Sequence, residues 1–100
     1  MRMMLKITIP TDAGNRVVKD GSISQILEKT MKQLKPEAAY FEADKGHRCA
    51  MLFFDMKESW EMPMIAEPLF RGLNADLELT PVMNADDLKK GLSGASKAKS

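Results

Sequence analysis

The sequence predicts one α+β domain whose elements follow the order strand, helix, strand, strand, helix, strand. Three observations support this fold class. Four short segments have the period-two or continuous apolar pattern of strands, and two longer segments carry apolar residues at helical spacing. A chain of 100 residues, of which 44% are hydrophobic and 29% charged, is long enough for one domain with a modest core and does not have a disordered composition.

The first strand and the first long helix are marked by their apolar periodicity. Over residues 4–9 the chain alternates, and Pro10 ends the strand. Residues 22–34 place their apolar side chains on one helical stripe, and the helix closes before a proline. Between these elements, Gly14 and Gly21 weaken a continuous helix, so we expect only a short helical turn there.

The middle of the chain predicts a β-hairpin. Residues 37–43 alternate as a second strand, and residues 44–46, Asp-Lys-Gly, have the composition of a tight turn. Residues 47–55 form a third strand that is apolar on both faces, which places it inside the sheet. Two sets of side chains compete for the helix-covered face of this strand: Cys49, Met51 and Phe53, or Ala50, Leu52 and Phe54.

The last third of the chain predicts a second helix and a fourth strand. We expect the helix at residues 62–73, with a kink at Pro68, because a proline removes one interior hydrogen bond. The fourth strand is expected at residues 75–80, where two leucines alternate with polar residues until Pro81 ends it.

A short extra helix is expected after the fourth strand. Asn84 is its predicted cap, and the helix is expected to continue through Leu92. After it, the chain contains only serine, glycine, alanine and lysine. We therefore predict a single folded domain over residues 1–92 and a flexible tail over residues 93–100.

A four-stranded sheet with two helices on one side leaves its other face uncovered. The helix-facing side chains of the expected core are Leu5, Ile7, Ile9, Phe41, Leu77 and Leu79. The other face mixes an apolar row from the third strand with Met4, Lys6, Thr8, Tyr40, Glu42 and Glu78. This face is either a partly solvated surface or a contact with the same face of a second subunit. We favour the second interpretation, because monomers avoid apolar patches of this kind.

The element order and the half-apolar open face resemble the dimeric α/β-barrel superfamily, whose subunits have a ferredoxin-like fold. This superfamily includes muconolactone isomerases and small cofactor-free monooxygenases. Residues 35–41 (KPEAAYF), 67–70 (EPLF), 81–83 (PVM) and 86–88 (DDL) look like segments of uncharacterised small bacterial proteins placed in it. The resemblance covers most of residues 4–92. It implies a homodimer whose two sheets enclose a cavity lined by polar side chains, and it carries no assigned chemistry.

Charge, apolar runs and cysteine content bear on the expected partners and location of the protein. Fifteen basic and fourteen acidic residues leave a net charge of +1, which is too small to gather nucleic acid or an anionic membrane. No apolar run approaches the ~20 residues of a membrane span, and Lys6 interrupts the first residues too early for a secretory signal. Cys49 is the only cysteine and lies in an apolar run, so we expect a reducing, cytoplasmic location.

Six side chains are candidates for lining a small-molecule cavity: Lys6, Thr8, Tyr40, Glu42, His47 and Trp60. Tyr40 and Glu42 are two residues apart on one strand, so they face the same way and lie beside Lys6 and Thr8 if the strands align. A hydroxyl, a carboxylate and an ammonium group in a partly desolvated cavity can take and deliver a proton. The alternative is a polar contact or ion pair between two sheets.

His47 and Trp60 are the other two candidates. His47 follows the hairpin turn and is the only histidine, a residue type suited to acid–base work, although a solvated hairpin residue is the competing interpretation. No second histidine or paired cysteine exists to build a metal site, and no phosphate-binding or dinucleotide motif occurs, so we predict no metal and no cofactor. Trp60 precedes the second helix and either walls a pocket or packs at the helix entry.

Two classes of function follow from these residues and the resemblance. The first is an enzyme that works in the cavity, an isomerase or a cofactor-independent oxygenase. The superfamily's oxygenases use a tryptophan together with an asparagine on the first strand, where this chain instead has Lys6 and Thr8. The second is a non-catalytic ligand-binding or regulatory module, because the same element order occurs in domains that bind amino acids.

Overall fold

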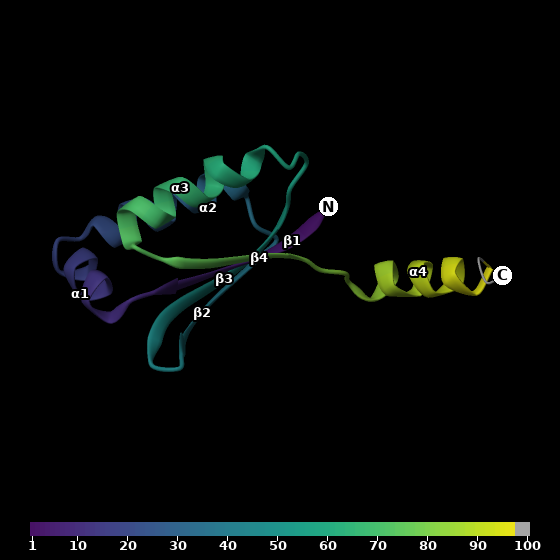
Figure 1. The fold of residues 1–100 in the computed structure, drawn as a ribbon, viewed down its shortest axis with the longest axis horizontal. Coiled ribbons are helices and arrows are strands. Elements are labelled where there is room, and N and C mark those ends of the chain that lie inside the picture. Colours follow the sequence, from purple (N-terminus) through teal and green to yellow (C-terminus); the bar gives the residue numbers. More distant parts are fainter. Residues whose placement is uncertain (98–100) are drawn as a thin grey trace.

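The computed structural model describes residues 1–97, which form a four-stranded antiparallel sheet and four helices. The strands are β1 (Arg2–Ile9), β2 (Ala38–Asp44), β3 (His47–Asp55) and β4 (Asp76–Pro81). The helices are α1 (Thr11–Lys19), α2 (Ser22–Leu34), α3 (Glu61–Leu73) and α4 (Ala85–Lys97). The strand order β2-β3-β1-β4 makes this an α+β fold consistent with a ferredoxin-like arrangement (Figure 1).

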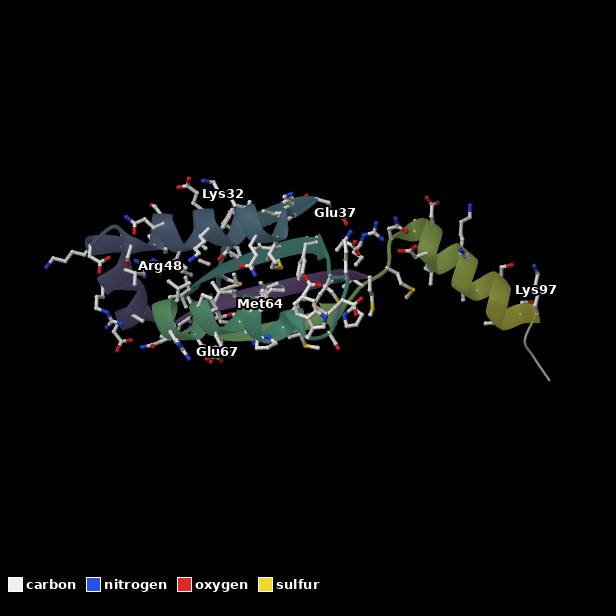
Figure 2. The ribbon with its side chains drawn as sticks, turned by 90° about the horizontal axis from the view of Figure 1, so that it is seen from above. Lys32, Glu37, Arg48, Met64, Glu67 and Lys97 are labelled. Atoms are coloured by element: carbon white, nitrogen blue, oxygen red, sulfur yellow. The ribbon has the colours of Figure 1, made fainter. Side chains whose placement is uncertain are left out.

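Helices α2 and α3 lie side by side over one face of the sheet, as the view from above shows (Figure 2). The other face, which we call the open face, carries no helix of the described chain (Figure 1). The strand register decides which side of β3 meets the helices, because Leu52 lies opposite Leu5 and Ala50 lies opposite Ile7. Cys49, Met51 and Phe53 therefore point to the open face.

The core lies between the sheet and the helices. Leu5, Ile7, Leu52, Leu69 and Leu73 are each no more than 1% exposed. The predicted contribution of β1 to the core is confirmed, and the two leucines of β4 are half-buried against it.

Phe41 is the exception among the predicted core residues, because its side chain is 59% exposed. It points to the helix side of the sheet, opposite Ala50, but it lies on β2, the edge strand. The sequence pattern identified its face correctly. The prediction of burial is wrong, since the helices leave this side of the edge strand largely uncovered.

Helix α1 is longer than the short turn that the sequence predicts. Its nine residues bury Ala13, Gly14 and Val17. A Cβ atom on Gly14 would lie 2.5 Å from Nη1 of Arg48, so glycine lets the guanidinium lie directly on the helix. Arg48 also donates a hydrogen bond to Oδ1 of Asn15 at 3.1 Å. The glycine that lowers helix propensity therefore serves the packing of α1 on β3.

The hairpin between β2 and β3 has the predicted two-residue turn. Lys45 and Gly46 both have positive φ values, 52° and 80°. Two successive residues of this kind are typical of the type I′ turns that match the twist of paired strands. The turn places Asp44 directly opposite His47, so both side chains lie at the same end of the sheet.

The other elements agree with the predictions except at some of their ends. Helix α2 has the predicted bounds, whereas α3 begins one residue earlier, at Glu61, and includes Pro68. Strand β4 includes Pro81, which lies opposite Met3 at the edge of the sheet and needs no donor there.

Helix α4 begins as predicted but ends later. The Asp87 amide donates to Oδ1 of Asn84 at 2.8 Å, and the Asn84 amide donates to Oδ2 of Asp87 at 3.2 Å, so the two residues cap the helix reciprocally. The helix continues to Lys97, past the predicted end at Leu92, and the flexibility predicted for residues 93–97 stays a prediction. The rest of that predicted tail, residues 98–100, lies outside the described residues.

Candidate functional site

The open face divides into an apolar end and a polar end. At the end where β1 begins, Met4 lies opposite Phe53, and the next row places Met51 between Lys6 and Tyr40. The rings of Tyr40 and Phe53 meet edge to face with their centroids 6.4 Å apart. We call Met4, Tyr40, Met51 and Phe53 the apolar end. The polar end comprises Lys6, Thr8, Glu42, Asp44, Lys45, His47, Asp76 and Glu78.

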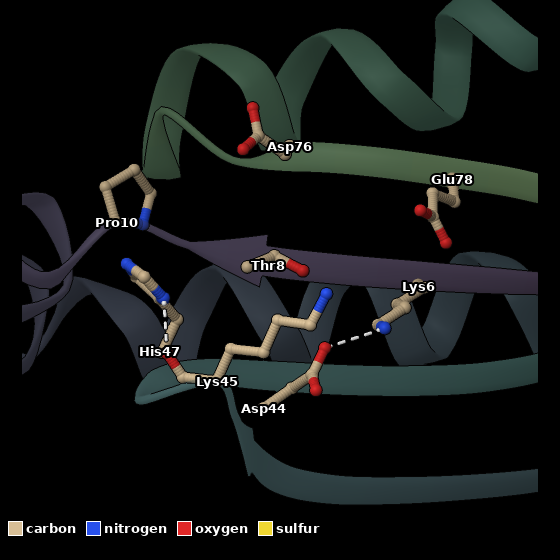
Figure 3. Close-up of a pocket in the computed structure, with 8 residues that line it drawn as sticks. All are labelled: Lys6, Thr8, Pro10, Asp44, Lys45, His47, Asp76 and Glu78. Carbon is tan, nitrogen blue, oxygen red and sulfur yellow. Dashed lines mark hydrogen bonds and ion pairs between the residues drawn. The ribbon is translucent and has the colours of Figure 1, made fainter.

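A pocket of about 370 Å³ lies at the polar end (Figure 3). Lys6 and Thr8 of β1 lie along its middle, and Asp76 and Glu78 of β4 border one side. The other side consists of hairpin residues, and the full lining is Lys6, Thr8, Pro10, Asp44, Lys45, His47, Asp76 and Glu78. Small-molecule sites in proteins begin at about 300 Å³, so the pocket has the size of a site for a small organic molecule.

An ion pair between β1 and the hairpin orders the centre of this pocket. Nζ of Lys6 lies 2.7 Å from Oδ2 of Asp44, and the two side chains are 25% and 27% exposed. The hydrogen bond and the positive charge of Lys6 lower the pKa of Asp44. The same hydrogen bond raises the pKa of Lys6. Partial burial of the ammonium group lowers this pKa, but by less. Both groups are therefore held in their charged forms.

This ion pair predicts a specific acid sensitivity. Because the pKa of Asp44 lies below its ordinary value of 3.8, the carboxylate stabilises the fold above that pH, and the contribution is lost as the pH falls through the folded pKa. In Asp44→Asn, the free energy of unfolding should therefore change less between about pH 5 and pH 2 than in the wild type. Urea unfolding at both pH values measures the difference. Asp12→Asn, at an exposed position on α1, is the control. Equal acid sensitivity of wild type and Asp44→Asn would contradict the assignment.

His47 lies at the hairpin end of the pocket. Its Nδ1 is 3.2 Å from the backbone carbonyl oxygen of Lys45. A carbonyl oxygen accepts, so this contact favours the tautomer in which Nδ1 carries the proton. In that tautomer Nε2 is an acceptor, which suits it to take a proton from a bound molecule.

Two carboxylates of β4 border the pocket without a cation of their own. Asp76 and Glu78 are two residues apart, so they project to the same face, opposite Thr8 and Lys6. Both are exposed, and within residues 1–97 neither forms an ion pair. The pocket therefore offers two carboxylates along β4. Along the hairpin it offers Lys45 and His47 beside the Asp44 carboxylate, which pairs with Lys6.

A group of metal-type ligand atoms also lies at the polar end. Carboxylate oxygens of Glu42 and Asp44 and Sγ of Cys49 lie within 4.8 Å of one another. The Lys6 ammonium already lies against Asp44 as its cation, and Cys49 is within 3.9 Å of the Thr8 hydroxyl that donates to it. We assign no metal to this group, because the ammonium group of Lys6 already pairs with its Asp44 carboxylate.

The structure brings together three of the six predicted cavity residues. Lys6, Thr8 and His47 line the pocket. Tyr40 and Glu42 share the open face but lie on the edge strand β2, outside the lining. Trp60 directly precedes α3, the helix on the opposite face of the sheet, and is 64% exposed, so it does not wall this pocket.

Sequence reasoning did not single out five of the lining residues as site residues: Pro10, Asp44, Lys45, Asp76 and Glu78. Asp44 and Lys45 were interpreted only as turn residues, although a hairpin places its turn beside the end of the neighbouring strand β1. For Asp76 a signal was present: it is two residues before Glu78 on one strand and therefore shares its face. Charged side chains on an edge strand are usually solvated. The alternation of β4 alone therefore did not distinguish a site residue from an ordinary surface residue.

Within residues 1–97, the helices are too short and too polar to cross a lipid bilayer. Comparison with other proteins adds no assignment. No protein-family model, curated protein or solved structure matches this chain. The assignment of this pocket as a candidate site therefore depends on its geometry alone. The pocket is open to solvent and contains the Lys6–Asp44 ion pair, with a histidine on one side and two carboxylates without an ion-pair partner on the other.

Proposed function

We propose that the protein binds a small zwitterionic molecule, of the size and charge pattern of an amino acid, in the pocket at the polar end of the open face. The single observation that carries this proposal is the division of charge around the pocket. Asp76 and Glu78 suit a cationic amino group. On the opposite side Lys6 neutralises the Asp44 carboxylate, and the ammonium group of Lys45 is left to favour an anionic group. A volume of about 370 Å³ accommodates such a molecule.

We further propose that a second copy of the chain covers the open face, so that the pocket lies between two sheets. The apolar end supports this assembly, because Met4, Met51 and Phe53 are half-buried and Tyr40 is 60% exposed on the same face. Apolar side chains grouped in this way are typical of protein contacts. This arrangement is the one implied by the resemblance to the dimeric α/β barrels, with each subunit a ferredoxin-like domain.

A non-catalytic binding or regulatory module is the primary proposal, and an acid–base enzyme such as an isomerase is the second. The specific observation for the enzyme is His47, which lines the pocket and whose Nδ1 contact with the Lys45 carbonyl oxygen favours an acceptor at Nε2. Oxygenase chemistry is less well supported, since Trp60 lies outside the pocket. Tyr40 and Glu42 also lie outside it, so we propose His47 rather than this pair as the proton acceptor.

Thermal melting in the presence of free amino acids tests the proposed binding. A molecule that binds only the folded protein raises the melting temperature. We expect at least one amino acid at millimolar concentration to do so, and we expect the double variant Asp76→Asn, Glu78→Gln to weaken its binding by about tenfold or more. Glu58→Gln, which removes an exposed carboxylate outside the pocket, is the matched control and should bind as the wild type does.

The same experiment separates the two functions. Recovery of the ligand unchanged supports the binding module. Conversion of the ligand supports the enzyme, and in that case His47→Gln should abolish conversion while retaining binding. If the double variant binds as tightly as the wild type, the carboxylates of β4 do not hold the ligand and the proposal is wrong.

A further inference from the structure

A separate pocket lies on the helix-covered side of the sheet, between α2 and the edge strand β2. Its volume is about 230 Å³, its walls are almost entirely apolar, and it is open to solvent. We call it the helix-side pocket. The side chains that the strands and α2 contribute to it on this side of the sheet are Ile9, Ile23, Leu27, Phe41, Arg48 and Ala50.

Phe41 borders the helix-side pocket at the edge of the sheet and is 59% exposed. Ile23 and Leu27 border the same pocket from α2 and are only half-buried. A hollow beside apolar side chains deprives them of dispersion contacts on one side and leaves apolar surface in water. An apolar group that fills the hollow restores those contacts. The pocket therefore favours an occupant with an apolar body.

Arg48 adds one positive charge to this apolar pocket. It lies at the end of the molecule where α1 packs against β3 (Figure 2). Gly14 leaves room for the guanidinium on α1, and Nη2 donates a hydrogen bond to Oδ1 of Asn15 at 3.1 Å. Within residues 1–97 the half-buried Arg48 forms no ion pair. Neutral groups therefore hold the guanidinium in place, and its charge is left for a ligand.

The carboxylate of Glu42 does not pair with this arginine, although Glu42 is among the residues that line the pocket. Glu42 follows Phe41 on β2, so its side chain projects to the open face. Guanidinium groups bind carboxylates through two parallel N–H···O bonds, and such charge-assisted bonds are stronger away from bulk water. An apolar pocket whose lining includes an arginine without an ion-pair partner suits a molecule that joins an apolar body to a carboxylate.

We propose that the helix-side pocket binds a small monocarboxylate whose apolar body has the size of a leucine or phenylalanine side chain. The body packs between Phe41 and the apolar side chains of α2, and its carboxylate accepts hydrogen bonds from Arg48. The volume of about 230 Å³ lies below the range typical of drug-sized ligands, which limits the occupant to a molecule of this size. A free amino acid is disfavoured, because its ammonium group would lose water without gaining a carboxylate partner.

This site is independent of the one proposed at the polar end of the open face. The two pockets lie on opposite sides of the sheet, and no residue lines both. The pocket at the polar end matches a zwitterion through two carboxylates and a lysine, whereas the helix-side pocket matches a simple anion through one arginine. Either proposal can fail without the other.

NMR titration of the isotope-labelled full chain tests the proposal. The probes are isocaproate, which is leucine without its amino group, and hydrocinnamate, which is phenylalanine without its amino group. We expect at least one of them to bind with a dissociation constant on the order of 1 mM and to shift the amide signals of Ile23, Leu27, Phe41 and Arg48. The neutral amide of the same acid should bind at least about tenfold more weakly, because it lacks the charge that pairs with the guanidinium.

Leucine is the comparison that tests the class of ligand. At the same concentration it should leave these four amide signals unchanged. If leucine shifts the signals of Thr8 and Glu78 while isocaproate shifts the four signals of the helix-side pocket, both proposed sites are supported. If leucine shifts the four signals as strongly as isocaproate does, the assignment of a simple carboxylate to this pocket is wrong.

Two substitutions, each with a matched control, separate the charge from the apolar wall. Arg48→Met should weaken isocaproate binding by about tenfold or more, whereas Arg71→Met, at an exposed position on α3, should change it by less than about twofold. Phe41→Ser should weaken it by about fivefold or more, whereas Tyr40→Ser, on the opposite face of β2, should leave it unchanged. Phe41 and Tyr40 are 59% and 60% exposed, so both serine variants should fold. This pair tests the site even if the loss of Arg48 loosens α1.

Three results would overturn the proposal. The first is equal affinity for an acid and its neutral amide. The second is wild-type affinity in Phe41→Ser. The third is the absence of any shift at the four amides with up to about 50 mM of either acid.

Discussion

Leu52→Ala should lower the free energy of unfolding by about 2 to 5 kcal/mol, the range found when a buried leucine is truncated. Leu52 is 1% exposed in the middle of β3 and faces the helices, opposite Leu5. Removing its side chain leaves a cavity that α2 and α3 cannot fill without moving. Urea unfolding monitored by circular dichroism measures the change.

The adjacent residue provides the matched control. Met51 lies on the same strand, but its side chain points to the open face and is only half-buried. Met51→Ala should therefore cost less than half as much as Leu52→Ala when the chain is monomeric. Equal costs at the two positions would contradict the assignment of the two faces of β3.

Phe53→Glu should disrupt the proposed dimer more than any other single change on the open face. Phe53 lies in the apolar end, between Met4 and Ala38 in the strand register and in edge contact with Tyr40. A carboxylate at this position would be buried without a partner once a second sheet covers it. We expect the dimer dissociation constant to rise by a factor on the order of 30, equivalent to about 2 kcal/mol. Light scattering over a concentration series measures it.

Thr80→Glu is the control for this prediction. Thr80 lies opposite Met4 on the edge strand β4, so it shares the row of Phe53 but is exposed at the rim. A charge at the rim of an interface remains solvated and should have little effect. If Phe53→Glu dimerises as the wild type does, the open face is not the contact between copies.

Much of the secondary structure could be predicted because its signals are local. The alternation of β1, the apolar stripe of α2 and the Lys45–Gly46 turn depend on neighbours within a few residues. The predictions that failed depended on distant residues. Phe41 has the pattern of a core residue, yet its burial depends on whether a helix extends over the edge strand. Helix α1 contains a glycine, yet that glycine accommodates Arg48 from another element.

The candidate site was only partly predictable for the same reason. Lys6, Thr8 and His47 could be selected because each is a polar or titratable residue on or beside a strand whose faces were assigned. Their association with Asp44 and Asp76 depends on the strand order, which brings β4 and the hairpin to opposite sides of β1. Trp60 was a candidate because it precedes a helix and because the superfamily's oxygenases use a tryptophan, but it lies at the start of α3, away from the pocket.

The α+β fold class, the order of the strands and the two long helices, and the existence of a sheet face with both apolar and polar residues could be predicted from local sequence patterns. These properties follow from periodicities of 2.0 and 3.6 residues, which operate along a single element. The folded structure was needed to establish which face of β3 is open, that Lys6 pairs with Asp44, and that α4 extends away from the sheet. Those features depend on register and packing between segments distant in the chain, and no local pattern encodes them.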